Sequence, residues 1–196
     1  MDMEVDGVLL AAGLSSRAGT FKMEAALAGK PLLAWSLEAM LRVCRRVIVV
    51  AGSQPERIRR LVQGRPGAEI VMNRNFASGM LASVQTGVAR VRAQRFFLLP
   101  GDMPLVRTAV YRKLLGCGAD IVVPACGGRR GHPVLISSRL VPGILAEAAG
   151  SSLGAFIQRH GSETVEVNDP GILADVDEFE DINKLDALLR AGSDDE

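Results

Sequence analysis

Two cations stand in a turn of small residues near the start of the chain, within GVLLAAGLSSRAGTFK at residues 7–22. Gly13 lacks a Cβ, so the turn can expose successive backbone N–H groups, which form a concave anion site. Arg17 can bind phosphate oxygens as a fork, and Lys22 can act as a point charge. The stretch has neither a P-loop nor a G-x-G-x-x-G pattern. It predicts a polyphosphate site, with an ordinary turn carrying two surface cations as the alternative.

A carboxylate follows a very apolar run at FFLLPGDMP, where Asp102 stands between Gly101 and Pro104. Mg²⁺ prefers oxygen ligands and is often held by one or two carboxylates together with substrate phosphates. Asp102 is therefore the predicted first metal ligand. The alternative is that Asp102 caps a helix beginning near Val106, because Asp is a preferred N-cap.

A second acidic group lies at ADVDEFEDI, residues 174–182. In an extended segment, alternation places Asp175 and Asp177 on the same face. Asp177 is the preferred second metal ligand, and the alternative is that it caps a final helix with Glu180 completing a capping box.

Three further residues have two interpretations each, and Gly131 has one. Ser83 faces a nucleotide or makes a local backbone hydrogen bond, and Asn73 caps a segment or contacts base or ribose. In RRGHPVLI, Gly131 allows close approach of a ligand, and His132 contacts that ligand or is a neutral imidazole bonded within its loop.

Apolar runs alternate with helical periodicity along the chain, which predicts a βαβ series and an α/β fold. Ligands in such sheets bind beyond the carboxyl ends of strands, where both the first turn and GDMP fall. The strand at 133–137 is expected to be antiparallel. The expected strands are 7–12, 46–51, 69–72, 95–99, 120–124 and 133–137, and the expected helices are 31–44, 56–62, 80–91 and 178–189.

Length, composition and charge indicate the class of protein to which these sites belong. At 196 residues and 48% hydrophobic, the chain suits a single domain over residues 1–190, followed by a frayed tail at 191–196. A net charge of +1 argues against a nucleic-acid partner. Three separated cysteines, no basic leader and no apolar segment of spanning length predict a cytoplasmic protein without membrane contact.

Taken together, the motifs resemble the nucleotidyltransferases that attach a nucleoside monophosphate to the molybdenum cofactor, and within them the molybdenum cofactor cytidylyltransferases. The resemblance covers nearly the whole chain. Its motifs are LAAGLSSRAGTFKM at 10–23, GKPLL at 29–33, GMLASVQTG at 79–87, GDMP at 101–104, GHP at 131–133 and DVDEFED at 175–181. Two departures are Ala18, where the family usually has Met, and Glu178–Phe179 in place of Thr-Pro.

The resemblance implies a Rossmann-like, mostly parallel twisted sheet flanked by helices, with a small antiparallel C-terminal element. It implies Mg²⁺-dependent transfer of CMP from CTP to a molybdopterin-type cofactor with release of pyrophosphate. Arg17, Lys22 and Asp102 would be catalytic, Asp102 and Asp177 would bind the metal, and Gly131 and His132 would bind the acceptor. The implied nucleotide-binding residues are Leu10, Ala11, Ala12, Gly13, Arg17, Gly19, Lys22, Asn73, Gly79, Ser83 and Asp102.

Three other functions stay open at this point. Guanylyl transfer to the same cofactor and cytidylyl transfer to another phosphate acceptor are alternatives within the enzyme class. A non-enzymatic carrier that brings cofactor to a molybdenum hydroxylase is the alternative outside it, and transient contact with such a hydroxylase is the partner that the resemblance implies.

Overall fold

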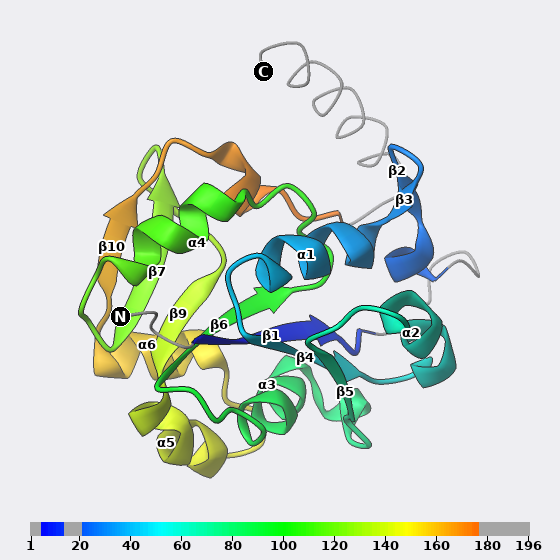
Figure 1. Cartoon of the computed structure of the whole chain (residues 1–196). Coiled ribbons are helices and arrows are strands. Elements are labelled where there is room, and N and C mark those ends of the chain that lie inside the picture. Colours follow the sequence, from blue (N-terminus) through cyan, green and yellow to red (C-terminus); the bar gives the residue numbers. More distant parts are fainter. Residues whose placement is uncertain (1–4, 14–20, 177–196) are drawn as a thin grey trace.

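The computed structural model describes residues 5–13 and 21–176. A mostly parallel sheet lies between two layers of helices (Figure 1). Arg17, Gly19, Asp177, the helix expected at 178–189 and the tail at 191–196 lie outside the described residues. The main-sheet strands are β1 (Val5–Ala11), β4 (Arg46–Ala51), β5 (Ala68–Met72), β6 (Arg95–Pro100), β7 (Ile121–Cys126), β8 (Arg129–Arg130), β9 (Val134–Ser137) and β10 (Glu163–Glu166). The helices are α1 (Leu32–Leu41), α2 (Pro55–Val62), α3 (Met80–Val88), α4 (Thr108–Leu115), α5 (Val141–Ala146) and α6 (Leu153–His160).

The strand order is β10-β7-β9-β6-β1-β4-β5, with β8 paired to β7. Strands β6, β1, β4 and β5 run parallel, and β9 is antiparallel to both β6 and β7. The α/β prediction and the antiparallel strand near residues 133–137 are therefore confirmed. A separate antiparallel pair, β2 (Ala26–Leu27) and β3 (Lys30–Pro31), was not expected.

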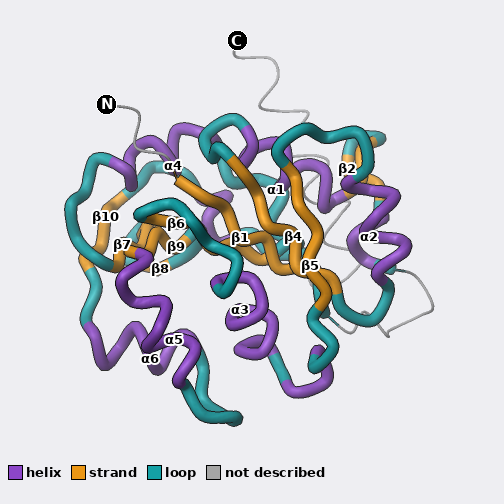
Figure 2. Tube along the Cα trace, turned by 60° about the horizontal axis from the view of Figure 1, so that its bottom comes forward, coloured by secondary structure: helices purple, strands orange, loops and turns teal. Residues whose placement is uncertain are grey.

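Alternating residues of the central strands supply two hydrophobic cores, one on each face of the sheet. Leu9, Val49 and Leu99 pack in the core that includes residues of α1, α2 and α4. The neighbouring strand residues, including Val8 and Leu98, pack in the core that includes residues of α3, α5 and α6. Figure 2 shows α3, α5 and α6 together on one side of the strands. Burial on both faces explains the nearly continuous apolar runs in these strands.

The strand order reverses at β1, which has β4 on one side and β6 on the other. The chain runs from β1 to β4 and β5 and then returns to β6, so the loops after β1 and β6 meet at the same edge. Such a switch point is where doubly wound sheets bind ligands. No helix among the described residues is long and apolar enough to cross a membrane.

Candidate active site

Lys22 and Asp102 meet at this switch point. Lys22 begins the short 3-10 helix η2 (Lys22–Glu24) that follows the turn after β1, and Asp102 comes directly after β6. The Nζ atom of Lys22 donates to Oδ2 of Asp102 at 2.9 Å. Their side chains are 19% and 24% exposed, so the pair is open to a ligand. Two residues 80 positions apart, each predicted separately, therefore share one site.

Main-chain hydrogen bonds fix the backbone around Asp102. Gly101 N donates to Leu10 O at 2.8 Å, which ties the loop after β6 to the end of β1. The buried hydroxyl of Ser36, from α1, donates to Gly101 O at 3.2 Å. On the other side, Val176 N donates to Asp102 O at 3.0 Å. The chain therefore passes Asp102 immediately before it reaches Asp177.

Asp102 is not a helix cap, which settles the alternative left open by its sequence. Helix α4 begins at Thr108 with Arg107 as its N-cap and has no side-chain capping bond. The carboxylate with a turn-capping role is the buried Asp169. Its Oδ1 accepts from Gly171 N at 2.9 Å, and its Oδ2 accepts from Arg107 N at 3.4 Å.

The end of β1 presents backbone to the site. Leu10, Ala11 and Ala12 are buried and contribute side chains to the cores on the two faces, whereas Gly13 is exposed. A Cβ built on Gly13 would meet nothing within 4 Å. A ligand at this edge would therefore contact the main chain of these residues, as an anion-binding turn requires.

Asn73 and Ser83 bond to each other. The Asn73 amide donates to Ser83 Oγ at 2.9 Å, and its Oδ1 accepts from Asn75 N at 2.8 Å. Both side chains are buried. The pair joins the end of β5 to α3, and the exposed Gly79, with φ at +98°, precedes that helix. Their contact with a nucleotide stays a prediction.

Gly131 is packed against protein backbone. A Cβ at this position would lie 2.3 Å from Ile172 O, in the 3-10 helix η5 (Pro170–Leu173), and His132 N donates to that same oxygen at 2.9 Å. A Cβ on Gly171 would lie 2.4 Å from Leu105 O. The loop of GHP, η5 and the loop after Asp102 are therefore in direct contact, which the sequence alone did not indicate.

The His132 imidazole is largely enclosed, and its Nδ1 is buried without a hydrogen-bond partner among the described residues. Burial lowers its pKa below the ordinary 6.5, against the opposing effects of the Leu98 carbonyl and the charges of Asp102 and Asp175. A neutral ring is therefore expected at pH 7.

A cavity of about 680 Å³ adjoins this loop. It is large enough for a small-molecule substrate. Gly131, His132 and the end of β6 form one wall, and α3 and α6 form others. Its lining includes Met80, Leu81, Leu98, Pro100, Arg130, Gly131, His132, Leu153 and Ile157.

The chemistry of the described carboxylate fits a hard divalent cation. Asp102 is partly exposed and already accepts a hydrogen bond from an ammonium group, so positive charge is accommodated at its oxygen. Within residues 5–13 and 21–176, no group of three or more His, Cys, Asp or Glu side chains could hold a metal alone. A site with few protein ligands suits Mg²⁺, which keeps waters and binds substrate phosphates.

Comparison with known proteins assigns the family. Residues 7–165 match the model described as the MobA-like NTP transferase domain. The chain belongs to this family. The matched region contains most of β1, Lys22, Asp102 and the GHP loop, and membership makes the protein a nucleotidyltransferase.

Relatives of this MobA-like protein carry two kinds of name. It is 28% identical to the molybdenum cofactor cytidylyltransferase of Escherichia coli K12, over 90% of this chain and 93% of the other. It is 32% identical to a probable molybdenum cofactor guanylyltransferase of Bacillus cereus, over 66% of this chain and 65% of that one. A nucleotidyl transferase from Methanothermobacter has the same fold, with a TM-score of 0.84 at 22% identity over 96% and 99% of the two chains.

Proposed function

We propose that this protein transfers CMP from CTP to a molybdopterin-type molybdenum cofactor and releases pyrophosphate. The observation that carries the proposal is the Lys22–Asp102 contact at the switch point of the sheet. A cation and a metal-binding carboxylate are what a triphosphate requires, and the adjoining cavity offers room for an acceptor.

The reaction needs no strong general base, because a terminal phosphate of the acceptor is already ionised near neutral pH. One of its oxygens forms a bond to the α-phosphorus of CTP, and the bond from that phosphorus to the bridging oxygen of pyrophosphate breaks. Positioning and charge neutralisation then supply most of the catalysis.

Each catalytic side chain has a defined role in this proposal. Lys22 exchanges its hydrogen bond with Asp102 for the phosphates of CTP and stabilises the departing pyrophosphate, together with Arg17. Asp102 and Asp177 would hold Mg²⁺, which neutralises phosphate charge when bound. The backbone from Leu10 to Gly13 binds the triphosphate.

The acceptor occupies the cavity beside Gly131 and His132. The neutral His132 ring suits contact with a pterin better than with its phosphate, and Arg130, which also lines the cavity, suits the phosphate. The family resemblance further suggests delivery of the product to a molybdenum hydroxylase.

CTP is proposed as the donor because the motifs of the sequence resemble those of the cytidylyltransferases, and a relative of that name is 28% identical over 90% of this chain. Guanylyl transfer is the second candidate, since a guanylyltransferase of Cereibacter sphaeroides is also 28% identical, over 96% of the chain. Incubation with molybdopterin cofactor, Mg²⁺ and CTP, GTP or ATP separates them through the mass of the adduct. Equal use of all three nucleotides would contradict the cytidylyl assignment.

Substitutions test the catalytic roles. Lys22→Ala and Asp102→Asn should each lower kcat by about 10²–10³, the size reported for loss of one charge-stabilising group. Lys113→Ala is the matched control, because Lys113 is exposed on α4 near the end of that helix. Wild-type turnover in Asp102→Asn at saturating CTP would refute the metal role. Binding of the cofactor with neither an adduct nor pyrophosphate release would instead favour the carrier function.

A further inference from the structure

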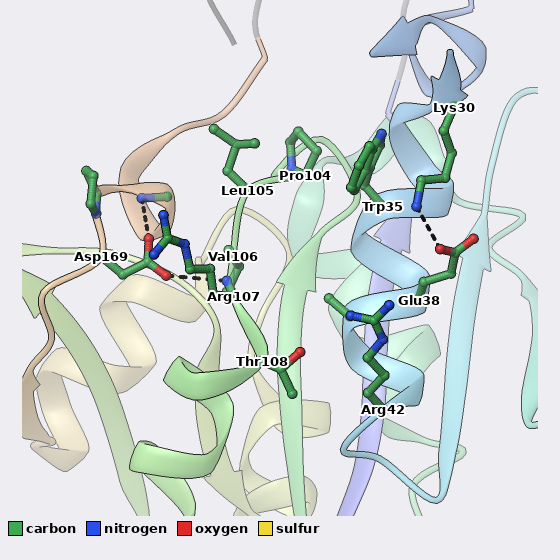
Figure 3. Close-up of a pocket in the computed structure, with 13 residues that line it drawn as sticks. Lys30, Trp35, Glu38, Arg42, Pro104, Leu105, Val106, Arg107, Thr108 and Asp169 are labelled. Atoms are coloured by element: carbon green, nitrogen blue, oxygen red, sulfur yellow. Dashed lines mark hydrogen bonds and ion pairs between the residues drawn. The ribbon is translucent and has the colours of Figure 1, made fainter. Parts of the chain in front are cut away.

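A second cavity lies on the α1 and α4 side of the sheet, behind the loop that carries Asp102. Its volume is about 460 Å³. Figure 3 shows Trp35 and Arg42 reaching it from α1, while Leu105 and Arg107 lie on the facing loop. The proposed nucleotidyl transfer uses none of these residues.

Within the described part of the chain, the side chains of the two arginines of this cavity have no protein partners. Neither Arg42 nor Arg107 makes an ion pair or a side-chain hydrogen bond with the rest of residues 5–13 and 21–176, and both are exposed. Lys30 differs, because its Nζ lies 2.8 Å from Glu38 Oε2 and 3.6 Å from the centre of the Trp35 ring. Two carboxylates also line the cavity, but Glu38 is paired with Lys30 and Asp169 accepts main-chain N–H groups. Arg42 and Arg107 therefore leave the cavity with a basic rim, beside the apolar side chains of Trp35 and Leu105.

The described chain ends beside this cavity. Val176, its last described residue, is buried in an apolar cluster with Ala25, Leu27 and Leu32. Trp35 and Leu105 pack against the same cluster and also line the cavity. Residues 177 onward therefore start next to the cavity wall.

The net charge of the sequence changes sign after residue 176. Residues 177–196 contain eight acidic and two basic side chains, a net charge of −6, whereas residues 1–176 have a net charge of +7. Phe179, Ile182, Leu185, Leu188 and Leu189 recur at three- and four-residue spacings, which predicts one apolar face of a helix. Glu180, Asp181 and Asp186 lie between these apolar positions.

We propose that the acidic segment 178–189 docks in cis on the cavity formed by α1 and the 104–108 loop. Its apolar face packs on Trp35 and Leu105, and its carboxylates pair with Arg42 and Arg107. Because Val176 N is bonded to Asp102 O, docking also fixes the chain on both sides of Asp177. That last consequence rests on the proposed function, whereas the docking itself does not.

Trp35 is the only tryptophan of the chain and reports on the cavity directly. Acrylamide quenching of its fluorescence is measured in the full chain and in the variant Leu185→Asp, with Leu185→Met as the control. Docking predicts that Leu185→Asp raises the quenching constant severalfold and that Leu185→Met leaves it unchanged. Raising the salt concentration should move the wild type toward Leu185→Asp, because exposed ion pairs are screened.

Charge reversal tests the ionic part of the contact. Arg42→Glu with Arg107→Glu should expose Trp35, and adding Asp181→Lys with Asp186→Lys should restore its protection. Arg90→Glu is the control, since Arg90 is exposed beyond the end of α3, in the layer on the other face of the sheet. Circular dichroism confirms that each variant is folded.

A labelled peptide of residues 177–196 gives a second readout that does not depend on turnover. It should bind the Leu185→Asp variant saturably and lose affinity in salt. The proposal is overturned if Leu185→Asp quenches like wild type, if the charge swap restores nothing, or if the peptide does not bind. If inorganic phosphate lowered the quenching constant of Trp35 equally in wild type and in Leu185→Asp, the cavity would be a site for a free anion instead.

Discussion

Gly131→Ala is expected to destabilise the fold and slow catalysis together. The added Cβ would lie 2.3 Å from Ile172 O and 2.9 Å from Ile172 C, distances that require the backbone of η5 to move. Overpacking of this kind costs about 1–3 kcal/mol. In a chain of this length each kcal/mol lowers Tm by about 2–4 °C, so a fall of several degrees is expected.

The effect on turnover follows from the path of the chain. η5 leads directly to Val176, whose N–H donates to Asp102 O at 3.0 Å, so a displaced η5 also displaces the backbone beside Asp102, the carboxylate to which we assign catalysis. Misplacement approaching 1 Å costs about 10²-fold in rate. We therefore expect kcat to fall about tenfold or more, with the KM for the nucleotide little changed.

Gly118→Ala is the matched control. Its Cβ would meet nothing within 4 Å, and the change should stay within about 0.5 kcal/mol of wild type. Urea unfolding and steady-state kinetics of both variants decide the matter. If Gly131→Ala were as stable as Gly118→Ala and raised only the KM for the acceptor, Gly131 would serve ligand approach rather than backbone packing.

Three further expectations concern stability. Burial alone would raise the pKa of Asp6, but hydrogen bonds from Arg46, Arg92 N and Ala93 N outweigh it and hold the pKa below 3.8. The stabilisation of the fold by ionised Asp6 is present above the pKa that Asp6 has in the unfolded chain, and it is lost as the pH falls through the pKa that Asp6 has in the folded protein. Asp6→Asn should therefore lower the free energy of unfolding, measured with urea, by about 2 kcal/mol at pH 7, and this difference from wild type should disappear in acid. A difference that stays constant down to pH 2 would contradict the prediction. Asn73→Ala and Ser83→Ala should show about 1 kcal/mol of coupling in a double-mutant cycle, and strict additivity would refute their mutual bond. Ser36→Ala should lower the free energy of unfolding by about 1 kcal/mol, because the Gly101 carbonyl loses its buried donor, and an unchanged urea midpoint would contradict this.

Sequence periodicity predicted the elements that pack in the two cores. Strand β4 has the predicted bounds 46–51, and the other predicted strands in the described region differ from the observed ones by a few residues. Strand β10 was missed because its sequence, ETVE, is largely exposed and has no apolar run. Helices α5 and α6 were missed because α5 contains Pro142 and Gly143 and α6 contains Gly154, residues of low helix propensity.

The candidate site was predictable in part. Lys22 and Asp102 each follow an apolar strand, and strand ends converge in a doubly wound sheet, so their meeting follows from sequence. The Asn73–Ser83 bond and the packing of Gly131 on Ile172 do not, because both depend on tertiary contacts between separate loops and elements. The position of a glycine in the sequence does not show which segment of backbone it packs against in the fold.

Main-chain bonds position the loop that carries Asp102, and the Lys22–Asp102 ion pair lies at the partly exposed end of that loop. Asp102 is fixed through Gly101 N to Leu10 O and through Val176 N to its own carbonyl, and neither bond involves the carboxylate. The carboxylate instead pairs with Lys22 at a partly exposed position, where an ion pair is worth about 1 kcal/mol or less. In the proposed reaction, phosphates and a divalent cation would therefore separate Lys22 from Asp102 at little cost, because the backbone that positions Asp102 does not have to move. Rigid placement of a weakly paired group is the preorganisation that nucleotidyl transfer requires.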